Sequence, residues 1–77
     1  MEIVDVVIVI SIVKEWDKDF TFSVIKAIEP NAELVKLNAS SFKLSGNFKR
    51  SSYVNILKYI SQIGGYISVN GYVPLKS

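Results

Sequence analysis

The first segment of the chain restricts the possible folds more than any other. From Ile3 to Val13 almost every residue is isoleucine or valine, and Asp5 is the one charged residue. β-Branched side chains lose rotamer freedom in helices and pack well on pleated sheets, so we expect a strand over Glu2–Lys14. Because both alternating faces of this strand are apolar, we expect a central strand with helices over one face. A second subunit is one candidate for covering the other face.

The same segment is far shorter than the roughly 20 apolar residues that a membrane span needs. The acids Glu2 and Asp5 precede or interrupt it, whereas a secretory signal begins with basic residues and ends at small ones. We therefore expect neither a membrane span nor a targeting segment. Without cysteine the sequence gives no redox indication of compartment, and a cytoplasmic location is the default expectation.

Residues 16–28 are predicted to form the first helix. Asp17 or Asp19 can cap its N-terminus, and Pro30 ends it because the residue before a proline avoids the helical region. The alternation Phe20-Thr21-Phe22 is also compatible with a strand. If the segment is helical, one face is apolar and should pack on the sheet; it comprises Phe20, Val24, Ala27 and Ile28.

A β-hairpin is predicted over Glu33–Leu37 and Phe42–Phe48. The four residues Asn38-Ala39-Ser40-Ser41 separate the two strands and favour a turn, because their side chains bond to nearby backbone groups. In the second strand, apolar Phe42 and Leu44 alternate with polar residues. We expect Gly46-Asn47 to mark a bulge or the end of this strand.

The second helix is the clearest element of the sequence. Ser51 or Ser52 can cap its start, and Gly64 can supply a left-handed stop at its end. Its predicted core face has the three-and-four spacing of one helical side and comprises Tyr53, Ile56, Leu57, Ile60 and Ile63. The opposite face, with Asn55, Lys58 and Tyr59, is then left for partners.

The tail is predicted to contain one further strand and a turn. Tyr66–Val69 alternates like a strand, and Asn70-Gly71 is a strong tight-turn pair. We expect Tyr72–Leu75 to fold back briefly after that turn, with Pro74 excluding it from the centre of a sheet.

The predicted order is β-α-β-β-α-β, which defines an α+β, ferredoxin-like sandwich: an antiparallel sheet with two helices on one face. Residues 1–77 form a single domain, and so small a domain hides only about 60% of the surface that its unfolded chain exposes. Yet 49% of the residues are hydrophobic. We expect part of this apolar surface to lie in an interface, in a dimer or heteromer; scattered apolar surface on a monomer is the alternative.

The residues available for catalysis are few. The chain has no cysteine and no histidine, which excludes thiolate chemistry, imidazole bases and the commonest zinc ligands. Asp17 and Asp19 are explained by a helix start. Gly64-Gly65 ends a helix, whereas phosphate-binding glycine loops precede one. We therefore predict a protein that is not an enzyme and uses no metal or cofactor.

Charge is unevenly distributed along the chain. Residues 1–33 contain all seven acids and three lysines, a net charge of −4, whereas residues 34–77 contain six cations and no acid. A half without carboxylates suggests a partner with negative charge, unless the two halves interleave in space. The candidate nucleic-acid-binding residues are Lys43, Lys49, Arg50 and Lys58.

Phe48 precedes two of these cations, so it could stack on a base. However, the first strand lacks the aromatic residue that single-strand RNA readers of this fold place on their sheet. We therefore expect Phe48 in the core, and we do not expect an RNA-recognition motif.

Two stretches, Val24–Asn31 and Arg50–Ile60, resemble the end of the first helix and the second helix of a known family. This family is the small dimerisation subunit of the KEOPS complex, or CTAG/Pcc family, and the complex makes threonylcarbamoyl-adenosine in tRNA. The resemblance, to this subunit or to a paralogue of it, implies a non-catalytic scaffold. Sheet edges would pair two such subunits as a homodimer or heterodimer.

The resemblance also implies that the helices pack on those of the catalytic, ATP-binding subunit, with tRNA as a further possible partner. The implied interface residues are Val24, Ile28, Asn55 and Tyr59.

Two other classes remain open. Ile60–Ile67 also resembles the CpcD-like linker domain of phycobilisomes, a structural protein. A small-molecule regulatory domain of the ACT type shares the predicted fold and pairs through its sheet.

Overall fold

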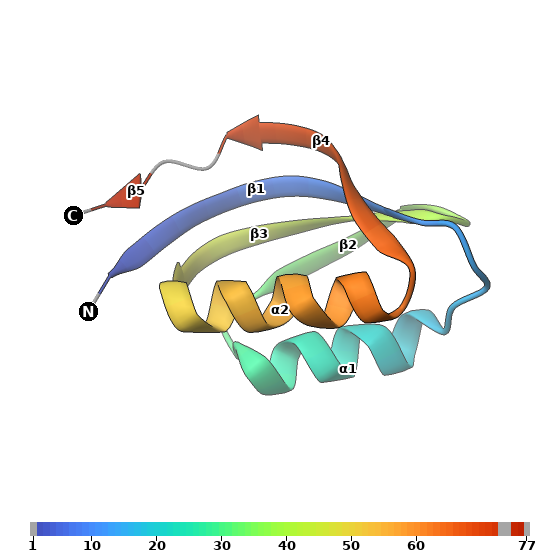
Figure 1. Cartoon of the computed structure of the whole chain (residues 1–77), viewed down its shortest axis with the longest axis horizontal. Helices are drawn as coiled ribbons and strands as arrows, with labels where there is room; N and C mark the ends of the chain where they lie inside the picture. The colour runs from blue at the N-terminus through green and yellow to red at the C-terminus, as the bar shows by residue number, and fades with distance from the viewer. Residues whose placement is uncertain (1, 73–74, 77) are drawn as a thin grey trace.

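A computed structural model describes residues 2–72 and 75–76 (Figure 1). The elements follow in the order β1 (Ile3–Ile12), α1 (Lys18–Ile28), β2 (Glu33–Asn38), β3 (Ser41–Lys49), α2 (Arg50–Gln62), β4 (Gly65–Tyr72) and β5 (Leu75–Lys76). The strands form one antiparallel sheet in the order β2-β3-β1-β4, and β5 also pairs with β1. Both helices cover the same face of the sheet (Figure 1). The predicted ferredoxin-like arrangement is therefore confirmed.

The first strand is central, as its composition predicts. β1 pairs with β3 on one side and with β4 and β5 on the other. Alternate residues of β1 point toward the helices and are buried; these are Val4, Val6, Ile8, Ile10 and Ile12. They pack with Phe42, Leu44 and Phe48 of β3 and with buried residues of both helices. Phe48 is fully buried, which confirms its predicted place in the core.

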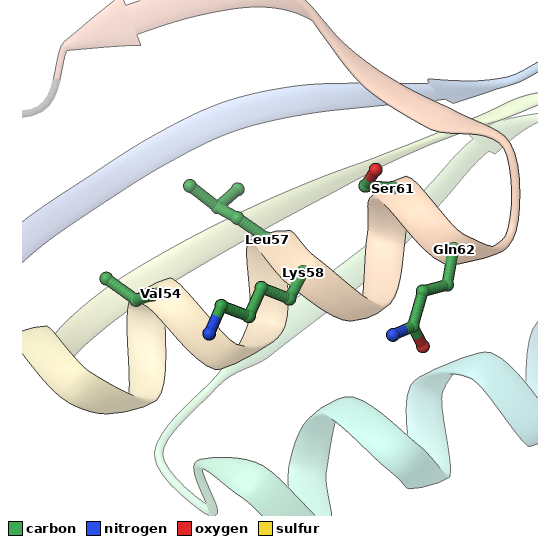
Figure 2. Close-up of a pocket in the computed structure, with 5 residues that line it drawn as sticks. All are labelled: Val54, Leu57, Lys58, Ser61 and Gln62. Carbon is green, nitrogen blue, oxygen red and sulfur yellow. The ribbon is translucent and has the colours of Figure 1, made fainter.

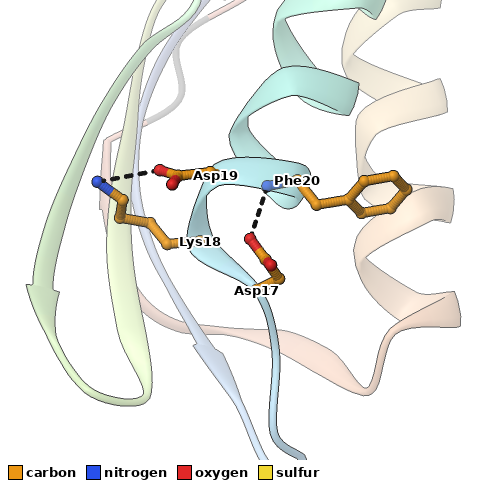
Figure 3. A network of polar contacts seen from close by, with 4 residues as sticks. All are labelled: Asp17, Lys18, Asp19 and Phe20. Carbon is orange, nitrogen blue, oxygen red and sulfur yellow. Dashed lines mark hydrogen bonds and ion pairs between the residues drawn. The ribbon is translucent and has the colours of Figure 1, made fainter.

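Helix α1 begins as predicted but turns a different side to the core. The Asp17 carboxylate caps it by accepting a hydrogen bond of 2.9 Å from the backbone N–H of Phe20, while Lys18 and Asp19 form an exposed ion pair (Figure 3). The buried residues are Thr21 and Ile25. Phe20 is 64% exposed, and its ring points away from the strands (Figure 3). The predicted face was only partly right: Ile28 packs against the core, but the buried Thr21 and Ile25 lie one position beyond the predicted Phe20 and Val24, a rotation of about 100° about the helix axis.

Helix α2 has the predicted core face but not the predicted start. Ile56 and Ile60 are buried, and Tyr53, Leu57 and Ile63 pack beside them. The prediction of a serine cap was wrong: Lys49 occupies the N-cap position without a side-chain cap bond. The backbone N–H of Arg50 instead donates to the Glu2 carbonyl oxygen, 3.0 Å away, so the start of β1 satisfies one of the helix's first donors.

The end of α2 agrees with the sequence. Gly64, with a φ of +82°, follows the C-cap residue Ile63 and allows the reversal into β4. None of the helices in the described part of the chain is long and apolar enough to cross a membrane.

Gly46 lies inside a continuous strand. β3 pairs with β1 without interruption from Ser41 to Lys49, and Gly46 lies opposite Val6, so the predicted bulge or strand end was wrong. The glycine is needed because its φ is +138° and a Cβ here would lie 2.8 Å from Cε1 of Phe48. Gly46 therefore marks a close approach of the Phe48 ring to the backbone.

The tail continues along β1 instead of turning back on itself. Asn70 and Gly71 lie within β4, so the predicted tight turn was wrong. β4 pairs with Val7–Ile12, and β5 pairs with Ile3 and Val4. The long, otherwise unpaired edge of β1 thus determines the course of the tail. The expectation for Pro74 falls outside the described residues.

Candidate protein-binding surfaces

The four predicted nucleic-acid-binding cations do not form one cluster. Lys43 projects from β3 on the sheet face opposite the helices, because its β3 neighbours Phe42 and Leu44 are buried beneath the helices. Lys58 lies on the exposed side of α2, in the helix layer. Only Lys49 and Arg50 lie together, at the junction of β3 and α2. A single extended ligand on one face would therefore not contact all four.

Arg50 also has a partner within the chain. Its Nη1 lies 2.9 Å from Oε1 of Glu2, and both side chains are partly exposed. This pair joins the acidic first half to the basic second half, so the charges of the two halves do mix at this end of the sheet. The positive guanidinium near the helix N-terminus is thus balanced by a carboxylate.

The sheet face opposite the helices is called here the open face. Its residues follow from the strand register, because paired residues in neighbouring strands project on the same side. Exposed or half-buried apolar residues of this face are Ile3, Val7, Val9, Val35 and Tyr66. Its polar residues in β1–β3 are Asp5, Ser11, Glu33, Lys43, Ser45, Asn47 and Lys49. The central strand is thus apolar on both sides, and one side has no cover in the described chain.

A second surface is an open hollow of about 490 Å³ along α2, called here the α2 hollow. Its lining residues recur at helical spacing and are Val54, Leu57, Lys58, Ser61 and Gln62. Figure 2 shows Val54 and Leu57 projecting from the same side of the helix, with the Lys58 side chain lying along it. Val54 is 42% exposed, and Leu57 is half-buried against the core.

The four predicted interface residues differ in their accessibility. Asn55 is exposed, and Val24 is half-buried. Ile28 and Tyr59 pack against the core, and the Tyr59 hydroxyl is buried without a hydrogen-bond partner among the described residues. The expectation that Tyr59 lies on a face left for partners was wrong, because α2 packs on α1 as well as on the sheet.

Sequence reasoning missed the α2 hollow. It assigned Leu57 only to the core and did not consider Val54, Ser61 and Gln62. The signal was the position of Val54, an apolar residue outside the predicted core face and three residues before Leu57.

No group of three or more potential metal-ligating acids is close enough, within the described residues, to hold a metal ion. Comparison with protein-family models, with curated proteins and with solved structures finds no match.

Proposed function

We propose that this protein is a non-catalytic assembly subunit that binds a partner protein through the α2 hollow. The observation that carries the proposal is the hollow itself, in which exposed Val54 and half-buried Leu57 lie on the same side of one helix. Apolar side chains one turn apart form a suitable floor for the apolar ridge of a helix from another protein.

Charge indicates the chemistry of that partner. Lys58 borders the hollow, and α2 contains no acidic residue between Arg50 and Gln62. An amphipathic helix with leucine or valine on its ridge and a carboxylate beside it would therefore complement this surface. The exposed amide of Gln62 can add a hydrogen bond at the rim.

We further propose that the complex is a KEOPS-like complex that modifies tRNA, with a catalytic, ATP-binding subunit as the helical partner. Support comes from the two stretches that resemble the KEOPS small subunit. Val24–Asn31 includes the end of α1, and Arg50–Ile60 makes up most of α2, so both lie in the same helix layer. A tRNA-modifying role would place the protein in the cytoplasm, and Lys49 and Arg50 would be its tRNA contacts.

The test is affinity purification from the native host, followed by reconstitution with the purified partner. Val54→Lys should abolish the interaction, because it places an ammonium group in the apolar floor, and lysine is at least as good a helix former as valine. Val7→Lys is the matched control: Val7 is 45% exposed and lies on the opposite face of the sheet.

The expected result is co-purification of a kinase-like protein and a large ATP-binding protein with the wild type and with Val7→Lys, but not with Val54→Lys. Recovery of other proteins would argue against the KEOPS-like assignment. An interaction that survives Val54→Lys in reconstitution would argue against the α2 hollow as its site.

A further inference from the structure

The open face leaves part of the central strand without a cover. Val7 is 45% exposed and Val9 is half-buried, although both lie on a strand that is paired on both sides. Ile3 lies on the same side of β1 beyond Asp5, Tyr66 is exposed on the neighbouring β4, and Val35 is exposed on β2, beyond Lys43 of β3. Exposed apolar residues that gather on one face between polar residues mark interaction sites on soluble proteins.

The size of the open face suits a specific interface. Four strands at about 4.8 Å spacing are roughly 19 Å wide, and nine residues at about 3.3 Å are roughly 30 Å long. The projected area is therefore about 570 Å² per copy, or about 1,100 Å² from two copies, which reaches the roughly 1,000 Å² of a specific protein interface. Two such faces can pack as a β-sandwich about 10 Å thick.

The charges favour a second copy as the occupant. β1–β3 place two acids, Asp5 and Glu33, and two lysines, Lys43 and Lys49, on this face. A face with balanced charges of both signs can complement itself across a twofold axis. A nucleic acid would require a cationic excess, which the described side chains of this face do not provide, although Tyr66 of β4 is an exposed aromatic residue here.

We propose that the open face binds a second copy of this chain, so that the two sheets pack face to face with the helices outside. This differs from the sheet-edge pairing that the family resemblance implies. It also uses a different surface from the proposed function, because the α2 hollow remains accessible on the outside of such a dimer.

The first test measures molar mass by size-exclusion chromatography with light scattering at micromolar to 100 µM protein. Wild type and Val54→Lys should be dimers, whereas Val7→Lys should be a monomer, because it brings two ammonium groups into an apolar interface. Val7 belongs to a central strand and cannot lie at a sheet edge. A monomeric wild type, or a folded Val7→Lys that remains dimeric, would overturn the proposal.

A second test remains informative if Val7→Lys does not fold. The chain has no cysteine, so a single introduced cysteine reports its own surroundings. Ser45→Cys, on the open face, should be joined to a second copy by a short bismaleimide, whereas Asn55→Cys, exposed on α2, should not. Equal cross-linking of the two variants would contradict face-to-face pairing. Loss of partner binding by Val54→Lys, in contrast, tests the proposed function only.

Discussion

At the scale of the residue, Gly46 shows how one position can limit what the strand tolerates. Its φ of +138° is unfavourable for any side chain, and a Cβ would also lie 3.0 Å from the carbonyl oxygen of Asn31. Gly46→Ala should therefore lower the free energy of unfolding by about 1–3 kcal/mol. Chemical denaturation measures this, with Asn47→Ala, at the exposed next position, as the control. An equal loss in both variants would show that Gly46 has no special role.

Tyr53 makes the stability of the folded protein depend on pH in the alkaline range. Burial raises the pKa of its phenol above the ordinary 10.0. As the pH rises past 10, the unfolded chain loses this proton before the folded chain does. The free energy of unfolding therefore falls as the pH rises from 10 to the raised pKa of the folded chain. Melting temperatures between about pH 9 and pH 11 should decline less in Tyr53→Phe than in wild type. Parallel declines in the two proteins would contradict this contribution.

At the scale of the element, the sequence predicted correctly those helices and strands in which the residue pattern and the intrinsic propensity agree. The β-branched run defined β1, and the stripe from Tyr53 to Ile63 defined α2, because period and propensity agree in both segments. The face of α1 was missed because its apolar residues, including both Phe20 and Phe22, surround much of the helix. The course of Asn70-Gly71 was missed because pairing with β1, distant in sequence, outweighs the local turn preference.

The start of α2 leaves a stabilising contact unused. Lys49 occupies the N-cap position without a side-chain cap bond, at the positive end of the helix dipole. Lys49→Asp should add a cap bond and a favourable charge, raising stability by about 1 kcal/mol and the melting temperature by roughly 4–8 °C. Lys49→Ala, which removes only the cation, should give a smaller gain. A melting temperature of Lys49→Asp that is no higher than that of Lys49→Ala would show that the aspartate does not cap the helix.

At the scale of the whole molecule, composition predicted a surplus of apolar surface but could not place it. Which residues reach the open face depends on strand register, since a shift of one residue moves a side chain to the other face. The pairing of Val35 with Lys43 and of Lys43 with Val9 therefore had to come from the structure. The same holds for charge, because the Arg50–Glu2 pair joins two residues that are 48 positions apart in the sequence.

The arrangement of cations leads to a prediction about tRNA. In a face-to-face dimer Lys43 lies inside the interface and Lys58 lies at the α2 hollow. The candidates left for phosphate contact are Arg50 and Lys49, which ends β3 and so lies at the rim of the open face. We predict that Lys49→Ala with Arg50→Ala weakens tRNA binding by the assembled complex. The slope of log affinity against log salt should decrease by about 1.4–1.8, the value for two lost phosphate contacts.

Folding should survive this double change, because the exposed Arg50–Glu2 pair contributes at most about 1 kcal/mol. The charge-matched control is Lys14→Ala with Lys26→Ala, which removes two exposed cations from the first half of the chain. Filter binding at several salt concentrations, with molar mass measured in parallel, separates lost RNA contact from lost assembly. A slope that stays at the wild-type value, or falls equally in the control, would leave Lys49 and Arg50 with no specific role in RNA binding.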